Sequence, residues 1–157
     1  MDKNQVMVEF IQQCPTIQNN PLFFNFAESG DGNNHFITEK DSVIRSYVDG
    51  SQLKQYTFTI ASYSYISHAA IINDDDNIVN ENIENMAKVQ EILDWINEQS
   101  NKCNFPDFGQ DCIVDNMITL TSDPDMDGID TSVNPPIARY SIGVKVEYLD
   151  NSKKLWN

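Results

Sequence analysis

The longest alternating stretch of the chain lies near its C-terminus, at residues 137–150 (IARYSIGVKVEYLD). One face is apolar or aromatic and carries Ala138, Tyr140, Ile142, Val144, Val146 and Tyr148. The other face carries Arg139, Ser141, Gly143, Lys145 and Glu147. Because successive side chains of a β-strand point to opposite faces, this pattern predicts a long strand with one buried face and one face open to solvent or to a neighbouring molecule. Pro135 and Pro136, which lack an N–H for a sheet ladder, mark its start.

The length and charge of the chain limit its class. A chain of 157 residues predicts one domain, covering residues 1–157, with a sizeable core. The chain has 24 acidic and 10 basic residues, a net charge of −14. Such a charge repels nucleic acid and anionic membrane surfaces, so we expect no binding to phosphate backbones. It remains compatible with a surface along which DNA passes without being held.

The sequence also predicts a reducing compartment. It contains no apolar run near the roughly 18 residues that a membrane helix needs. Its first ten residues, MDKNQVMVEF, lack the apolar core of a signal peptide. We therefore expect folding in the cytoplasm, and we expect Cys14, Cys103 and Cys112 to be free thiols.

Two segments have the apolar spacing of an amphipathic helix. The first covers residues 3–14 and ends before Pro15, because a proline disfavours helical backbone in the residue that precedes it. The second covers residues 82–100, and its buried side is made of Ile83, Met86, Ala87, Val89, Leu93 and Ile96.

Further strands are expected in pairs. Asp41–Val48 and Gln55–Ile66 flank Asp49-Gly50, a favoured hairpin turn. The side chains of Cys112–Ser122 alternate again, so we expect a strand that pairs with the C-terminal strand. The polar segment Asp123–Asn134 connects the two. Residues 22–26 are expected as a short strand or a packed loop, and residues 27–41 as a loop. This order predicts an α+β fold: an antiparallel sheet of about four to five strands, with an N-terminal helix and a central amphipathic helix packed on one face.

The acidic excursion contains a partial calcium motif. Asp123, Asp125 and Asp127 stand in DPDMDG, which matches the D-x-D-x-D-G opening of a calcium loop. The match ends there, because position twelve is Asn134 instead of a bidentate Glu and no helices flank the segment. The alternative interpretation is an acidic loop at the tip of a hairpin.

Other chemistry-bearing residues form no recognised motif. Asp74–Asp76 have no His or Cys beside them, and neither His35 nor His68 has a nucleophile at motif spacing. Strand tyrosines lack the interleaved basic residues that base stacking on a nucleic acid needs. We therefore expect no enzyme activity and no cofactor, and we interpret the aromatic residues as core and as a self-association surface.

Three stretches together resemble a known family: SYVDGSQLKQYTFTIAS (46–62), a helix containing DWINEQ (94–99), and PPIARYSIGVKVEYLD (135–150). In the order of their elements and in short stretches of sequence, they are similar to the small tail-terminator, or tail-completion, proteins of long-tailed bacteriophages of Gram-positive hosts. Such proteins are often labelled minor capsid proteins. The resemblance covers roughly residues 40–150 and is carried by Tyr47, Asp49, Gly50, Phe58, Pro136, Tyr140 and Tyr148. The loop 29–41 and the insertion DPDMDGID have no counterpart in it.

The resemblance implies a structural protein of the virion. Proteins of this family form a homohexameric ring that caps the tail tube and offers a surface for head–tail joining. The implied partners are further copies of the chain, the tail-tube protein and neck or connector proteins, with DNA passing through the lumen unbound. The implied location is the neck region of the virion, after assembly in the host cytoplasm.

From the residues themselves, the candidate interface consists of Arg139, Lys145 and Glu147 on the last strand, with Asp130 in the acidic segment. Two alternatives remain: a head–tail connector or stopper of the same particle, and a calcium-binding interaction module built on Asp123, Asp125 and Asp127.

Overall fold

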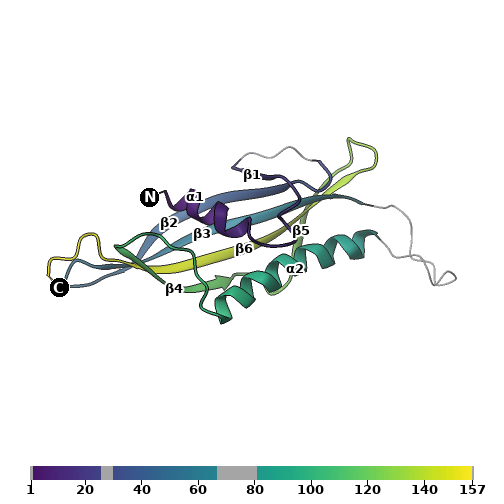
Figure 1. The fold of residues 1–157 in the computed structure, drawn as a ribbon. Coiled ribbons are helices and arrows are strands. Elements are labelled where there is room, and N and C mark those ends of the chain that lie inside the picture. The colour runs from purple at the N-terminus through teal and green to yellow at the C-terminus, as the bar shows by residue number, and fades with distance from the viewer. Residues whose placement is uncertain (1, 26–29, 67–80, 157) are drawn as a thin grey trace.

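The computed structural model describes residues 2–25, 30–66 and 81–156 (Figure 1). His68 and the acidic run Asp74–Asp76 lie outside the described residues. The elements are, in chain order, α1 (Lys3–Ile11), β1 (Leu22–Phe24), β2 (Asn34–Ser46), β3 (Gln52–Tyr65), α2 (Glu81–Asn101), β4 (Cys112–Thr119), β5 (Asp125–Asp130) and β6 (Ile137–Asp150). The predicted α+β class with a mostly antiparallel sheet is confirmed. Neither described helix is both long and apolar enough to cross a membrane.

The sheet is built around β6. Its strand order is β1-β2-β3-β6-β4, with β5 also paired to β6, so it has six strands instead of the four to five predicted. Strand β6 pairs with β3 along its whole length, from Gln52↔Asp150 to Tyr65↔Ile137. Its other edge is shared, since β4 pairs with residues 144–150 and β5 with residues 137–141. Strand β1 pairs with β2 in parallel, which the predicted antiparallel sheet did not include.

Two segments predicted as loops are strands. Residues 34–41 form the first part of β2, because Phe36 is fully buried and its ring stacks on Phe58 at a centroid distance of 4.6 Å. Residues 125–130, predicted as part of a polar excursion, form β5. This segment pairs with the part of the β6 edge that β4 leaves open, which supplies partners for backbone groups that would otherwise be unpaired.

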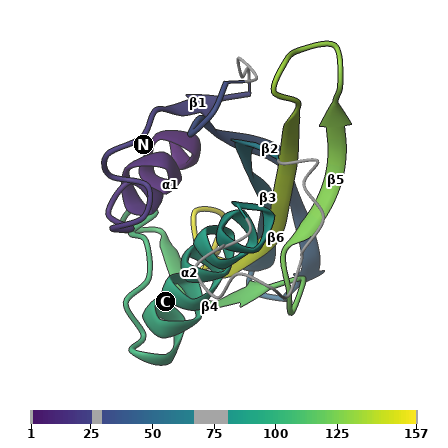
Figure 2. The same cartoon turned by 90° about the vertical axis from the view of Figure 1, so that its right-hand side faces the viewer.

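Both helices lie over the same face of the sheet, as Figure 2 shows from the end of the molecule. The apolar side of β6, predicted from the alternation, is buried against them. Helix α1 contributes Met7, Phe10 and Ile11 to this core, and α2 contributes Val89, Ile92, Leu93 and Ile96. The rings of Phe10 and Trp95 lie 5.4 Å apart and connect the two helices. The three cysteines are free thiols, as predicted.

The β2–β3 hairpin and the C-terminal residues extend together to one end of the elongated molecule (Figure 1). The hairpin turns at Asp49-Gly50, as predicted, and Gly50 has a φ of +89°. The carboxylate of Asp49 accepts a hydrogen bond from the N–H of Ser51, and the N–H of Leu155 donates to the carbonyl of Asp49 at 2.6 Å. A side chain at Gly50 would collide with the carbonyl oxygen of Lys153, so glycine is needed here for two reasons.

The substitution Gly50→Ala should therefore lower the free energy of unfolding by more than the approximately 1–2 kcal/mol expected from a positive φ alone. Gly109→Ala is the matched control, because Gly109 also has a positive φ (+105°) and an added Cβ there meets nothing within 4 Å. Urea unfolding of both variants measures the difference. Equal losses would contradict a close approach of the C-terminal segment to the hairpin turn.

Candidate functional site

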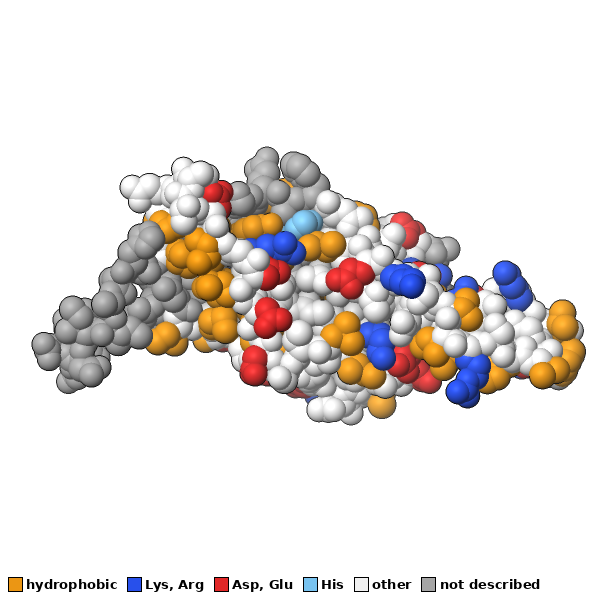
Figure 3. Space-filling model, turned by 180° about the vertical axis from the view of Figure 1, so that it is seen from behind, with side chains coloured by type: hydrophobic (Ala, Val, Ile, Leu, Met, Phe, Trp, Pro, Cys, Tyr) orange, Lys and Arg blue, Asp and Glu red, His pale blue; other side chains and the backbone are white. Residues whose placement is uncertain are grey.

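The face of the sheet opposite the helices is open. It carries Arg139, Ser141, Lys145 and Glu147 of β6, and their cross-strand partners Tyr63, Ala61, Thr57 and Gln55 of β3. In the described part of the chain no helix covers this face, which Figure 3 shows from outside. We call it the open sheet face. The polar side of β6 predicted from the alternation is thus accessible, although most of its side chains are only partly exposed.

Three of the four predicted interface residues lie together on the open sheet face. Lys145 and Glu147 form an ion pair with an N–O distance of 3.0 Å. Arg139 lies 3.5 Å, from Nε to Oδ1, from Asp127 of the neighbouring strand β5. Asp130, the fourth, lies at the end of β5 and accepts hydrogen bonds from the hydroxyl and the N–H of Ser132. These two bonds hold the pKa of Asp130 below its usual value.

The open sheet face carries side chains of both charges on a strongly negative chain. Three of its carboxylates are engaged, since Glu147 pairs with Lys145, Asp127 with Arg139, and Glu39 accepts a hydrogen bond from Thr59. Asp125, opposite Ser141 in the register, lies on the same face and is exposed. The strand register places Lys40 and Arg45 on this face as well, and neither has an ion-pair partner among the described residues. Helix α2, on the other side of the molecule, exposes Glu84, Glu91, Asp94 and Glu98. Lys40 and Arg45 thus offer local positive charge on the open sheet face, and the outer side of α2 offers negative charge.

The calcium motif does not adopt the shape of a calcium loop. Asp125 and Asp127 lie on β5, and an extended strand does not curve around an ion as a calcium loop does. Asp127 already accepts a hydrogen bond from Ser141 at 2.8 Å and faces Arg139. Among the described residues no group of three His, Cys, Asp or Glu side chains is placed to hold a metal ion.

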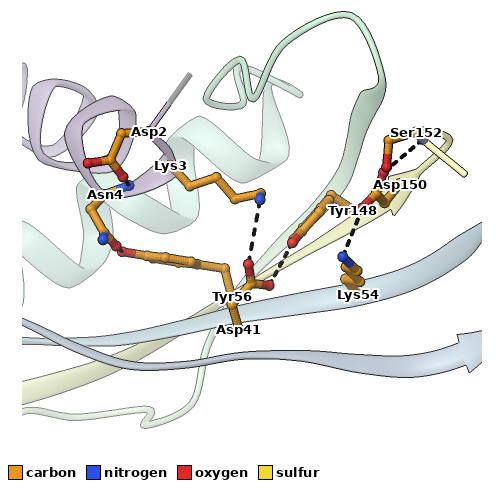
Figure 4. A network of polar contacts seen from close by, with 9 residues as sticks. All are labelled: Asp2, Lys3, Asn4, Asp41, Lys54, Tyr56, Tyr148, Asp150 and Ser152. Carbon is orange, nitrogen blue, oxygen red and sulfur yellow. Dashed lines mark hydrogen bonds and ion pairs between the residues drawn. The ribbon is translucent and has the colours of Figure 1, made fainter.

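A polar network on the covered side joins α1 to the sheet (Figure 4). The hydroxyl of Tyr148 donates to Asp41 at 2.6 Å, and the same carboxylate lies 3.5 Å from the ammonium of Lys3. The hydroxyl of Tyr56 donates to Asn4 of α1 at 2.5 Å. The partners are far apart in the sequence, so no local motif could have revealed the network.

The network stabilises the fold and offers no reactive group. Burial raises the pKa of Tyr56, and burial together with the hydrogen bond to Asp41 raises that of Tyr148, so both hydroxyls stay protonated. Burial acts to raise the pKa of Asp150, but hydrogen bonds from Lys54 and Ser152 outweigh it and hold this pKa well below its usual range. Lys54 and Asp150 form an ion pair at 2.8 Å with little exposed surface.

His35 lies in β2 rather than in a loop, beside the open sheet face. Burial lowers its pKa, and the nearby charge of Arg139 lowers it further, so the imidazole is neutral at pH 7. Among the described residues neither ring nitrogen has a partner in hydrogen-bond geometry.

A scan against protein-family models and a search of curated proteins found no match to this chain.

Calcium should leave the stability of the protein unchanged. A ligand that binds only the folded state raises the melting temperature, and the extended β5 offers no loop for the ion. Thermal unfolding in calcium chloride and in EDTA measures this, with Asp125→Asn as the control variant. A calcium-dependent rise in Tm that Asp125→Asn abolishes would revive the calcium hypothesis.

The Lys54–Asp150 pair should make stability depend on acid pH. Because the pKa of Asp150 is lower in the folded than in the unfolded chain, its contribution is present above about pH 4 and is lost as the pH falls. Asp150→Asn should lower the free energy of unfolding at pH 7 by about 2 kcal/mol and flatten its dependence on pH below 4. Glu98→Gln is the control, because the exposed Glu98–Lys102 pair contributes less than about 0.5 kcal/mol. Equal acid sensitivity in the wild type and Asp150→Asn would contradict this assignment.

Proposed function

We propose that the chain is a structural protein of a bacteriophage virion: a tail terminator that caps the tail tube as a homohexameric ring and offers a surface for head–tail joining. The observation that carries the proposal is the open sheet face, a polar surface of long paired strands. Its Lys40 and Arg45 have no ion-pair partner among the residues that the structure describes. The stretches that resemble the family supply this surface and its surroundings. They fall on β3 and β6, on α2, and on the hairpin turn.

A ring requires two different surfaces on each subunit. In a heterologous contact one face of a subunit meets another face of the next, and rotation closes the ring. The open sheet face and the acidic outer side of α2 form such a pair, because Lys40 and Arg45 on the first oppose Glu91 and Asp94 on the second in charge. Arg139, Lys145 and Glu147 lie within the first surface.

The strong negative charge suits a conduit for DNA. A lumen with acidic walls repels the phosphate backbone, so DNA passes without being held. The partners that follow from this role are the tail-tube protein and neck or connector proteins, and the location is the neck of the virion. A connector or stopper of the same neck would use the same surfaces, and the position of the protein in a map of the whole particle distinguishes the two roles.

Electron microscopy of the purified protein, alone and mixed with tail tubes, should show rings of six subunits. Lys145→Glu places two like charges side by side with Glu147 on the open sheet face, so it should weaken ring formation about tenfold. Asn19→Asp, at an exposed position after α1 and outside both surfaces, is the control for added negative charge. A protein that stays monomeric at high concentration and does not bind tube ends would contradict the proposed function.

A further inference from the structure

The extended end of the molecule exposes a cluster of large apolar side chains. Val48 is 92% exposed, Leu155 73%, Trp156 56% and Tyr47 41%. We call these four residues the arm tip; Figure 3 shows apolar side chains gathered at this end of the molecule. Single exposed apolar residues are common, but a contiguous group is typical of an interaction site.

The arm tip is held in place by backbone contacts. The N–H of Leu155 donates to the carbonyl of Asp49, which joins the C-terminal segment to the hairpin turn. The N–H of Asn151 donates to the carbonyl of Asp111 at 2.7 Å, and the N–H of Lys154 to the carbonyl of Asn151 at 3.0 Å. The chain therefore folds back and still presents Leu155 and Trp156 to solvent.

An apolar groove lies toward the other end of β6. It has a volume of about 370 Å³ and is lined by Ile66, Met86, Met126, Ile129 and Tyr140. We call it the β5–α2 groove. No other described element covers it, because α2 packs on β4, β6 and β3, and Met126 and Ile129 of β5 stay about half exposed.

The arm tip cannot fill the groove of its own molecule. Tyr140 lines the groove, whereas the arm tip lies beyond Asp150 at the other end of the same strand. Ten residues of extended strand separate them by about 33 Å. Any arm tip that enters the groove must therefore belong to a different molecule.

Charge favours a second copy of this chain as the occupant. Lys153 and Lys154 flank the apolar residues of the arm tip and are exposed. The exposed carboxylate of Asp123 precedes the groove residues Met126 and Ile129 on the chain. The arm tip and the β5–α2 groove are thus both apolar, and the charges beside them are opposite in sign.

We propose that the arm tip of one molecule inserts Leu155 and Trp156 into the β5–α2 groove of the next, with Lys153 and Lys154 facing Asp123. The contact is heterologous, so repetition yields a closed ring or an open filament. This inference rests on the proposed function, for which it names a contact that closes the ring.

Disulfide trapping tests the contact. All variants carry Cys103→Ser, because Cys103 is an exposed thiol. An equimolar mixture of Leu155→Cys and Ile129→Cys should form crosslinked dimers on mild oxidation about tenfold faster than a mixture of Leu155→Cys and Val43→Cys, since bound thiols share a high effective concentration. Val43 is the matched control, being as exposed as Ile129, at 49%. The double variant Leu155→Cys/Ile129→Cys should give a ladder that ends at one closed species.

Trp156→Ala provides a second measurement. Because Trp156 is exposed in the monomer, its removal should leave the melting temperature of the monomer unchanged and weaken self-association by about tenfold or more. Sedimentation of the wild type and the variant over a range of concentrations measures this change.

The outcomes separate the contact from the function. Rings in the microscope without preferential crosslinking, and with unchanged association of Trp156→Ala, would overturn the contact and leave the proposed function standing. Preferential crosslinking into open filaments without rings would support the contact and overturn the terminator role. Absence of both crosslinks and rings would overturn both.

Discussion

The pairing of β6 on both of its edges is the interaction on which the rest of the structure depends. Strand β3 pairs with one edge over the full length of β6, and β4 and β5 share the other edge. A shift of one residue in this register would turn every side chain of β6 to the opposite face, so the pairing also decides which face is apolar. The helices cover that face, and the other stays polar. The core and the candidate interface therefore both follow from the alternation of apolar and polar residues along β6.

The attachment of α1 shows how the covered face combines apolar packing with a few polar contacts. Tyr56 and Tyr148 bury their rings in the core, and each directs its hydroxyl to a polar partner, Asn4 and Asp41 respectively. A buried hydroxyl without a partner would be costly. The bond from Tyr56 to Asn4 and the ion pair of Lys3 with Asp41 restrict how α1 can lie on the sheet. The raised pKa of both tyrosines follows from the same burial. The polar network thus positions α1 on the sheet and offers no reactive group.

Local periodicity predicted the elements whose pattern is complete within themselves: β6, α2 and the hairpin turn at Asp49-Gly50. It placed Arg139, Lys145 and Glu147 on one face for the same reason. It missed β5 and the first part of β2, because those polar segments become strands only by pairing with an edge that a distant part of the chain supplies. The ion pair of Arg139 with Asp127 was hidden too, since it depends on a bulge between Met126 and Gly128. The arm tip could not be predicted either, because it joins residues 47–48 to residues 155–156.

The high net charge is compatible with the proposed assembly, because the repulsion between copies and the attraction at their contacts act over different distances. Copies with a charge of −14 repel one another, but at physiological salt the repulsion between exposed charges is screened beyond about 8 Å. Contacts between Lys153 or Lys154 and a carboxylate of the next copy act over shorter distances and are screened less. In the proposed assembly, the local placement of cations at the arm tip and on the open sheet face would therefore matter more for association than the net charge. In the proposed ring, the remaining negative charge would line the conduit and repel the phosphates of DNA.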